Sequence, residues 1–236
     1  MSNFFQQIID SLKDSLKNIK EINLLENFKS IFTEPLGILT VVALLIIMLV
    51  LIRVKKIKFS ARLLAQISLM LALTIILDSF KIYRLPQGGS ITLGSMLPIF
   101  LLSLWYGPEI GMLTGFLFGV ISLILGPYIV HPIQLLLDYP LPYLALGTAG
   151  FFKNKKYLGV SVAIVLRFLC HVISGVVFFA EYAAESGYSS ALWYSIVYNG
   201  SFLIFDAAIC VLLLALIPVE RLGKIASSQY QVVGNK

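Results

Sequence analysis

The chain has 236 residues, of which 58% are hydrophobic and only 13% are charged, and its mean hydropathy is +0.91. Soluble domains have about 25% charged residues, so these values exclude a soluble globule and indicate an integral membrane protein. The apolar residues form long charge-poor stretches rather than alternating segments, which favours helices over a β-barrel. In such a protein the net charge of +6 bears on membrane orientation and implies no nucleic-acid partner.

Residues 1–35 form an amphipathic N-terminal extension. Apolar residues recur at helical spacing between Phe4 and Ile19, whereas Lys13, Asp14 and Lys17 lie on the other face. This pattern predicts a helix that lies on a membrane surface or against the rest of the protein. The segment has no cleavable signal peptide pattern.

The next segment, Leu36 to Ile52, has 17 residues without a charge and leads into a basic cluster that ends at Arg62. This predicts an extra transmembrane helix and a basic cytoplasmic linker over residues 36–58. The alternative is a re-entrant or interfacial segment that leaves residues 1–35 in the cytoplasm.

Residues 59–222 are expected to form one membrane domain, followed by a cytoplasmic tail at 223–236. Its six expected spans are Leu63–Ser79, Met96–Leu104, Ile110–Leu125, Ile133–Phe151, Leu158–Ala180 and Ser195–Ile217. The third carries Gly111, Gly115 and Gly119, which allow a neighbouring helix to approach closely. Prolines at 140 and 142 interrupt the fourth.

The charges of the loops predict the orientation. Six alternating spans place ten basic residues, in segments 53–62, 153–156 and 221–224, on one side, and only Lys81 and Arg84 on the other. Positive charges favour the cytoplasm, so the C-terminus is expected inside. The N-terminus is expected to be extracellular because the extra helix adds a seventh crossing.

Polar residues within the apolar segments are functional candidates, because placing them in lipid is costly. Those that fall in the outer half are Asp138, Tyr139, Arg167, His171, Tyr194 and Asn199. A carboxylate, a histidine, an amide and aromatic rings at one membrane face favour a pocket for a small, polar, aromatic and cationic ligand.

Simpler roles remain open for these residues. Arg167 and Asp138 could form an ion pair that makes both tolerable in lipid, His171 could be satisfied by a carbonyl group, and Tyr194 could belong to an interfacial aromatic belt. His131 fits loop structure better than ligand contact. Asp78 and Asp206 lie near span ends and are not assigned.

Motifs for enzymatic chemistry are absent from the sequence. It has no P-loop, no HExxH and no GxSxG pattern, so the chain is expected to be a binding module rather than an enzyme, and to rely on a motor in another protein. The two cysteines, Cys170 and Cys210, lie in apolar segments and are expected to be free thiols. No cofactor and no metal are expected.

Several segments of the chain form a recognisable series. They are 84–90 (RLPQGGS), 97–99 (LPI), 126–132 (GPYIVHP), 137–140 (LDYP) and the pattern of 167–183 that begins RxxxH, followed by Tyr194 and Asn199. Together they resemble the thiamin-specific S component of energy-coupling factor (ECF) vitamin transporters. The resemblance covers roughly residues 62–220 in order. It says nothing about residues 1–58, which hold no candidate pocket residue, so their removal is expected to leave ligand binding unchanged.

The resemblance implies a six-helix subunit whose pocket opens to the outside and binds thiamin. It assigns to the pocket Asp138 and Tyr139, Arg167 and His171, Phe179 as a stacking ring, and Tyr194 with Asn199. It also implies that small residues four apart on the first body helix, here Ser68 and Ala72, contact the ECF transmembrane coupling subunit, which works with two cytosolic ATPase subunits.

One departure from the family concerns a stacking tryptophan of the first outer loop, which aligns with Gly89. Tyr83 is a possible substitute. Two other functions stay open: an S component for another vitamin, such as riboflavin or a pyridoxine-like compound, and an intramembrane hydrolase or acyltransferase that uses Asp138, His171 and Asn199.

Overall fold

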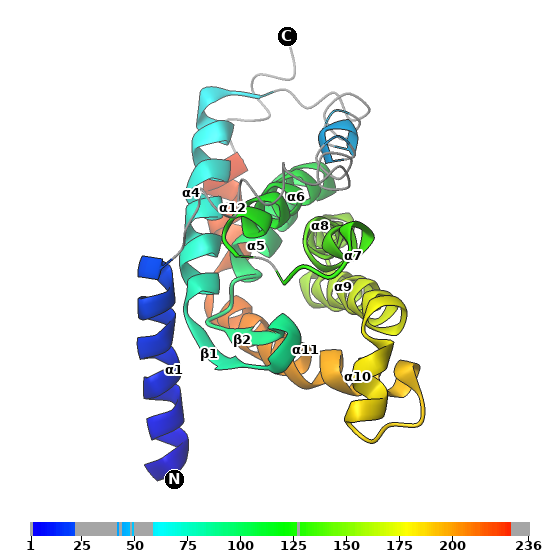
Figure 1. The fold of residues 1–236 in the computed structure, drawn as a ribbon. Helices are drawn as coiled ribbons and strands as arrows, with labels where there is room; N and C mark the ends of the chain where they lie inside the picture. The colour runs from blue at the N-terminus through cyan, green and yellow to red at the C-terminus, as the bar shows by residue number, and fades with distance from the viewer. Residues whose placement is uncertain are drawn as a thin grey trace.

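The computed structural model describes residues 2–21, 42, 44–47, 49, 59–126 and 128–227. The longer helices are α1 (Ser2–Glu21), α4 (Ala61–Ser79), α5 (Leu97–Tyr106), α6 (Pro108–Ile124), α9 (Lys156–Phe178) and α11 (Ala191–Leu216). The short elements are β1 (Lys81–Arg84), η1 (Pro86–Gly88), β2 (Ser90–Thr92), α7 (Pro132–Asp138), α8 (Pro140–Leu146), η2 (Gly147–Phe152), α10 (Ala180–Glu185) and α12 (Val219–Ser227). Figure 1 shows a largely helical molecule, as the composition predicts.

Each of the six spans expected between residues 59 and 222 corresponds to helical structure. Among the described residues, α4, α9 and α11 are long and apolar enough to cross a membrane, and α5 and α6 are shorter apolar helices. The fourth span is divided into α7, α8 and η2, with the break at Tyr139, which precedes Pro140. Proline disfavours the helical conformation in the residue that precedes it, so the break lies where the sequence predicts it.

The glycines of the third span bring α6 against the divided fourth span. A Cβ atom at Gly115 would lie 2.0 Å from the carbonyl oxygen of Tyr143, and one at Gly119 would lie 2.5 Å from the Cα atom of Pro140. Only glycine permits backbones to pack this closely. The small-residue prediction for α6 is therefore confirmed, and the close contact fixes Tyr139 and Tyr143 relative to the core.

A hairpin of β1 and β2 was not predicted. The strands pair antiparallel, with Arg84 opposite Ser90. Asp206 of α11 accepts hydrogen bonds from the backbone N–H of Thr92 (3.0 Å) and from its hydroxyl (2.7 Å). These bonds attach β2 to α11. The hairpin lies towards one end of the molecule (Figure 1).

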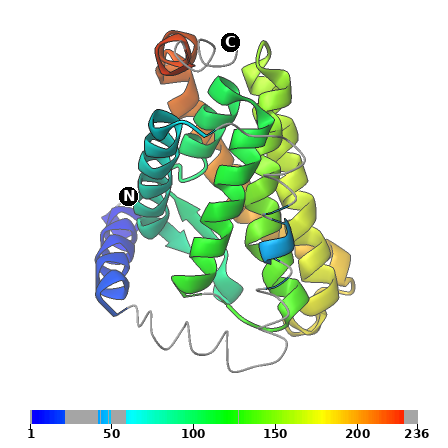
Figure 2. The ribbon, with the colours of Figure 1, turned by 90° about the horizontal axis from the view of Figure 1, so that it is seen from above.

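The expected amphipathic helix of the N-terminal extension is α1. It packs against β1 and the neighbouring end of α4, as both views of the ribbon show (Figures 1 and 2). Most of the expected extra span, Leu36–Ile52, lies outside the described residues. Within it, residues 44–47 are helical, and Leu44 packs against Phe116, Leu123 and Leu135.

The opposite end of the molecule carries the described basic loops. Arg62, near the start of α4, donates a hydrogen bond to the carbonyl oxygen of Ile225 in α12 (3.4 Å). Trp105 at the end of α5 donates to the carbonyl oxygen of Val219 (2.9 Å), and Lys153 lies beside Gly107. The described basic residues of the three segments expected in the cytoplasm therefore share one end, whereas α1 and the hairpin lie at the other (Figure 1).

Candidate ligand-binding site

All the side chains that the sequence analysis assigned to a binding site line one cavity of about 450 Å³. They are Asp138, Tyr139, Arg167, His171, Phe179, Tyr194 and Asn199. The volume is typical of small-molecule sites, which measure roughly 300–1,000 Å³. The cavity lies among α7, α9, α11 and the hairpin.

Asp138 is the acidic group at the end of α7. Its Oδ2 accepts a hydrogen bond from Nε2 of Gln134 (2.6 Å), and its Oδ1 lies 3.4 Å from Nδ1 of His171. Gln134 is itself buried and is held by the backbone of Tyr128 and Val130. The carboxylate is therefore oriented by two neighbours and faces the cavity with a fixed geometry.

Arg167 does not form the ion pair with Asp138 that was considered as an alternative. Its guanidinium carbon lies 4.4 Å from the centroid of the Tyr143 ring, and Nη2 lies 3.5 Å from the Tyr143 hydroxyl. Nε and Nη1 are buried and have no hydrogen-bond partner among the described residues, and the same is true of Nε2 of His171. Buried polar atoms without partners are costly, so two donors of Arg167 and one ring nitrogen of His171 are left unsatisfied beside this cavity.

Asn199 and Ser195 form the polar part of the α11 wall. Nδ2 of Asn199 donates to the Ser195 carbonyl (2.9 Å), to its hydroxyl (3.1 Å) and to the carbonyl of His171 (3.3 Å). The side-chain carbonyl of Asn199 has no partner among the described residues. These bonds tie α11 to α9 and leave the amide oxygen as a free acceptor.

Aromatic rings line the remaining walls. The Phe179 ring lies 6.0 Å from that of Tyr128, and along α11 the Tyr194 and Tyr198 rings are stacked at 5.8 Å, followed by Phe202 at 6.0 Å from Tyr198. Tyr194 is buried, which contradicts its alternative assignment to an interfacial belt, whereas its neighbour Trp193 is 63% exposed. Rings and a carboxylate together favour a flat cationic ligand.

The position of the missing outer-loop tryptophan is occupied by other rings. A Cβ atom at Gly89 would lie 2.8 Å from the Tyr198 hydroxyl and 2.9 Å from the Phe202 ring. Tyr198 also accepts a hydrogen bond from the Gly89 N–H (3.1 Å). Tyr83, the suggested substitute, is 53% exposed and does not line the cavity, so that suggestion is wrong. Tyr198 and Phe202 supply the aromatic surface instead.

His131 has the structural role that the sequence favoured. Its Nδ1 accepts a hydrogen bond from the N–H of Ile133 (3.1 Å) and caps α7, and its ring stacks on Phe178 at 5.0 Å. Capping satisfies a donor that a helix start leaves unpaired. His131 does not line the cavity.

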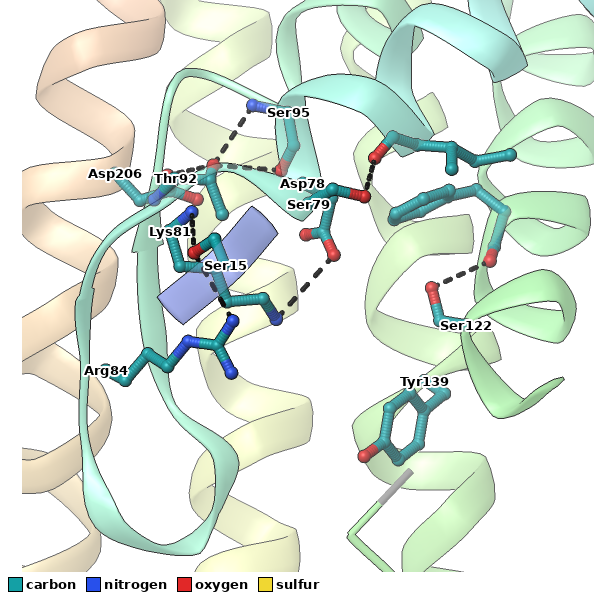
Figure 3. Close-up of polar contacts among 12 residues, drawn as sticks. Ser15, Asp78, Ser79, Lys81, Arg84, Thr92, Ser95, Ser122, Tyr139 and Asp206 are labelled. Atoms are coloured by element: carbon teal, nitrogen blue, oxygen red, sulfur yellow. Dashed lines mark hydrogen bonds and ion pairs between the residues drawn. The ribbon is translucent and has the colours of Figure 1, made fainter. Parts of the chain in front are cut away.

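The sequence analysis missed several residues that line the cavity. They include Asp78, Lys81, Arg84, Gln134, Tyr143, Tyr198, Phe202 and Asp206. Residues four apart share a helix face, so the series Tyr194, Tyr198, Phe202 and Asp206 could have been found from its spacing. Asp78 and Lys81 form an ion pair (3.8 Å) at the hairpin, where Figure 3 shows them beside Arg84.

The N-terminal extension also contributes to the cavity, which corrects an expectation. Ser15 of α1 is fully buried and lines the cavity. Figure 3 shows it next to Lys81 and Arg84. The expectation that residues 1–58 hold no pocket residue is therefore wrong. The sequence could not reveal this contact, because it joins segments 66 residues apart and has no local pattern.

Ser68 and Ala72 lie away from the cavity. Both are exposed on α4, together with Leu64, Leu69 and Ile76. Only 17% of the membrane-length window of α4 is buried inside the protein, compared with 33% for α9 and for α11. Helix α4 therefore has a large apolar face that the described residues do not cover.

Comparisons with known proteins agree with this architecture. A family model described as thiamine transporter protein (Thia_YuaJ) matches residues 64–226. The thiamine transporter ThiT of Bacillus subtilis strain 168 is 37% identical over 174 residues, which cover 65% of this chain and 88% of that protein. ThiT of Lacticaseibacillus paracasei is 24% identical over 143 residues, or 52% of this chain and 70% of that protein.

A solved structure of ThiT from Listeria monocytogenes has the same fold. It superposes with a TM-score of 0.61 at 20% identity and covers 70% of this chain and 96% of that chain. The family match begins at residue 64, so α1 lies outside it. The family and both sequence relatives are named as transporters and not as enzymes.

Proposed function

The chain belongs to the thiamine transporter protein family, and from this premise we propose that it is the substrate-binding membrane subunit of an ECF-type vitamin importer. It binds extracellular thiamin, and uptake is driven by two cytosolic ATPase subunits through a transmembrane coupling subunit. Residues 59–222 form the binding domain. The observation that carries the proposal is that the seven residues assigned from the sequence line one cavity within the matched region.

The chemistry of the cavity fits thiamin group by group. Thiamin has a flat aminopyrimidine, a permanently cationic thiazolium and a hydroxyethyl tail. Asp138 offsets the positive charge or pairs with the aminopyrimidine, and the ring of Phe179 stacks on the ligand. Nε2 of His171, which has no partner among the described residues, and the amide oxygen of Asn199 serve the directional hydrogen bonds to the ligand.

Selectivity follows from the same unpaired groups. A buried site rejects a ligand that leaves its polar groups without partners, because each unpaired group costs about 1–3 kcal/mol. The unpaired N–H groups of Arg167 and the unpaired ring nitrogen of His171 therefore disfavour a purely apolar ligand of the same shape.

The ligand itself is tested with the purified full chain. We expect thiamin to bind saturably in isothermal titration calorimetry, and riboflavin and pyridoxine to give little heat at the same concentrations. Mass spectrometry of the small molecule that co-purifies gives an independent result. Tight binding of another vitamin in preference to thiamin would contradict the proposal, and covalent change of the bound ligand would support the hydrolase alternative.

The proposed orientation places the hairpin and α1 outside and α12 in the cytoplasm. It is supported by the positive residues Arg62, Lys153 and Lys224, which lie at the end of the molecule opposite the hairpin. Positive loops favour the cytoplasmic side. With the C-terminus inside, an extra span at 36–52 makes the N-terminus extracellular.

Cysteine labelling of intact cells tests this orientation. In a chain that carries Cys170→Ala and Cys210→Ala, Asp14→Cys on the exposed face of α1 is expected to react with a membrane-impermeant thiol reagent. Lys224→Cys on α12 is the matched control and is expected to react only after permeabilisation. The reverse pattern, or labelling of neither site before permeabilisation, would contradict an extracellular N-terminus.

A further inference from the structure

Helix α1 contacts the ligand cavity through one buried serine. Ile8, Ser11, Leu12 and Ser15 have the lowest exposure of the described α1 side chains, whereas Gln6, Asp10 and Asp14 are exposed. Positions 8, 11, 12 and 15 follow helical spacing and form one face. This face packs against β1, and Ser15, at its C-terminal end, is fully buried.

The Ser15 hydroxyl connects α1 to the hairpin by hydrogen bonds. It donates to the carbonyl oxygen of Ser11 in its own helix (2.8 Å). It accepts from the backbone N–H of Lys81 (3.3 Å) and from Nη2 of Arg84 (3.3 Å), and Figure 3 shows both contacts. A single side chain thus holds the first and last residues of β1.

The hairpin is consequently attached along both of its strands. Asp206 of α11 binds β2 through Thr92, and Ser15 of α1 binds β1 through Lys81 and Arg84. Residues 84–90, between the two attachments, line the cavity with few gaps. Tyr198 of α11 also holds this segment through the N–H of Gly89. Movement of the wall away from α1 requires the bonds of Ser15 to break.

We propose that α1 is a clamp on the hairpin wall of the ligand cavity, with Ser15 as its positioning residue, and that it slows release of the bound ligand toward the side on which α1 lies. The inference rests on the proposed function for the identity of the ligand, thiamin. The clamp itself is a contact between α1, which the family match does not include, and β1, which lies within it.

Hydrogen exchange tests the clamp without any ligand. The exchange rate of peptides that span residues 81–92 is compared among three proteins. They are the unaltered full chain, the full chain with Ser15→Ala, and a chain without residues 1–21. Loss of the Ser15 acceptor leaves the Lys81 N–H to be satisfied by water, so we expect faster exchange in both variants. Asp14→Ala, one residue away on the exposed face, is the matched control and is expected to exchange like the unaltered chain.

Thiamin release tests the consequence for function. The dissociation rate of radiolabelled thiamin is expected to rise at least fivefold in Ser15→Ala, because both bonds to β1 are lost and the loss of one corresponds to about fivefold. It is expected to rise further in the truncated chain. Binding stoichiometry stays at its original value, which separates a faster exit from a misfolded site. Asp14→Ala is again the control.

The outcomes distinguish the clamp from the proposed function. Unchanged exchange of residues 81–92 in both variants would overturn the clamp, and so would faster exchange with an unchanged rate of thiamin release. A full chain that binds no thiamin would instead contradict the proposed function. In that case hydrogen exchange alone decides whether α1 holds the hairpin.

Discussion

Asp138→Asn is expected to weaken thiamin binding at least tenfold, or by about 1.4 kcal/mol. Asparagine has nearly the same shape. Its oxygen can still accept from Gln134, and its amide can donate to Nδ1 of His171 when the imidazole takes the other tautomer, so the substitution removes the negative charge and keeps the shape of the site. A cationic ligand beside Asp138 depends on this opposite charge, because the dielectric inside a protein is lower than in water and strengthens the attraction. Isothermal titration calorimetry on the purified chain measures the change.

His171→Ala is the companion variant and is expected to have an effect of similar size. It removes the ring nitrogen Nε2, which has no partner among the described residues, and it frees one oxygen of Asp138 from its contact with Nδ1. Glu181→Gln, an exposed carboxyl on α10 that does not line the cavity, is the charge-matched control and is expected to bind normally. Normal affinity of Asp138→Asn and His171→Ala in folded protein would remove both residues from the site.

The fold could be predicted where neighbouring residues in the sequence form a long continuous pattern. Segments such as α9 and α11 have an uninterrupted apolar stretch of membrane length, and the break at Tyr139 follows from the proline after it. The hairpin could not be predicted in this way. Each of its strands has only three or four residues, and β2 is held by Asp206, which lies 114 residues further along the chain.

The residues of the candidate site also fall into those that a local signal in the sequence reveals and those that it does not. Asp138, Arg167 and His171 were found because a charge or an imidazole is rare within an apolar helix and therefore conspicuous. Tyr198 and Phe202 look like ordinary membrane aromatics in the sequence, and only their four-residue spacing from Tyr194 marks the face that they share. The resemblance to a family identified Phe179. Ser15 could not be assigned to the cavity from the sequence, because its contacts are with residues far along the chain.

The Ala72→Trp substitution on α4 is expected to abolish thiamin uptake by the assembled transporter while thiamin binding stays within about twofold of the original. Helices in membranes associate closely where small side chains let their backbones approach, and a bulky ring at such a position separates them. Ala72 and Ser68 are exposed on the least buried of the membrane-length helices, which is where we propose that the coupling subunit binds. Uptake of radiolabelled thiamin by cells and binding by the purified variant give the two measurements.

Ala208→Trp on α11 provides the matched control. Ala208 is exposed on a different membrane-length helix, so the same ring is added to an exposed position outside α4. We expect it to leave both uptake and binding unchanged, which separates loss of docking from a general effect of tryptophan on membrane insertion. Uptake that survives Ala72→Trp would place the coupling subunit on another face, whereas loss of uptake in both variants would mean that either surface is sensitive to added bulk and that α4 has no special role in coupling.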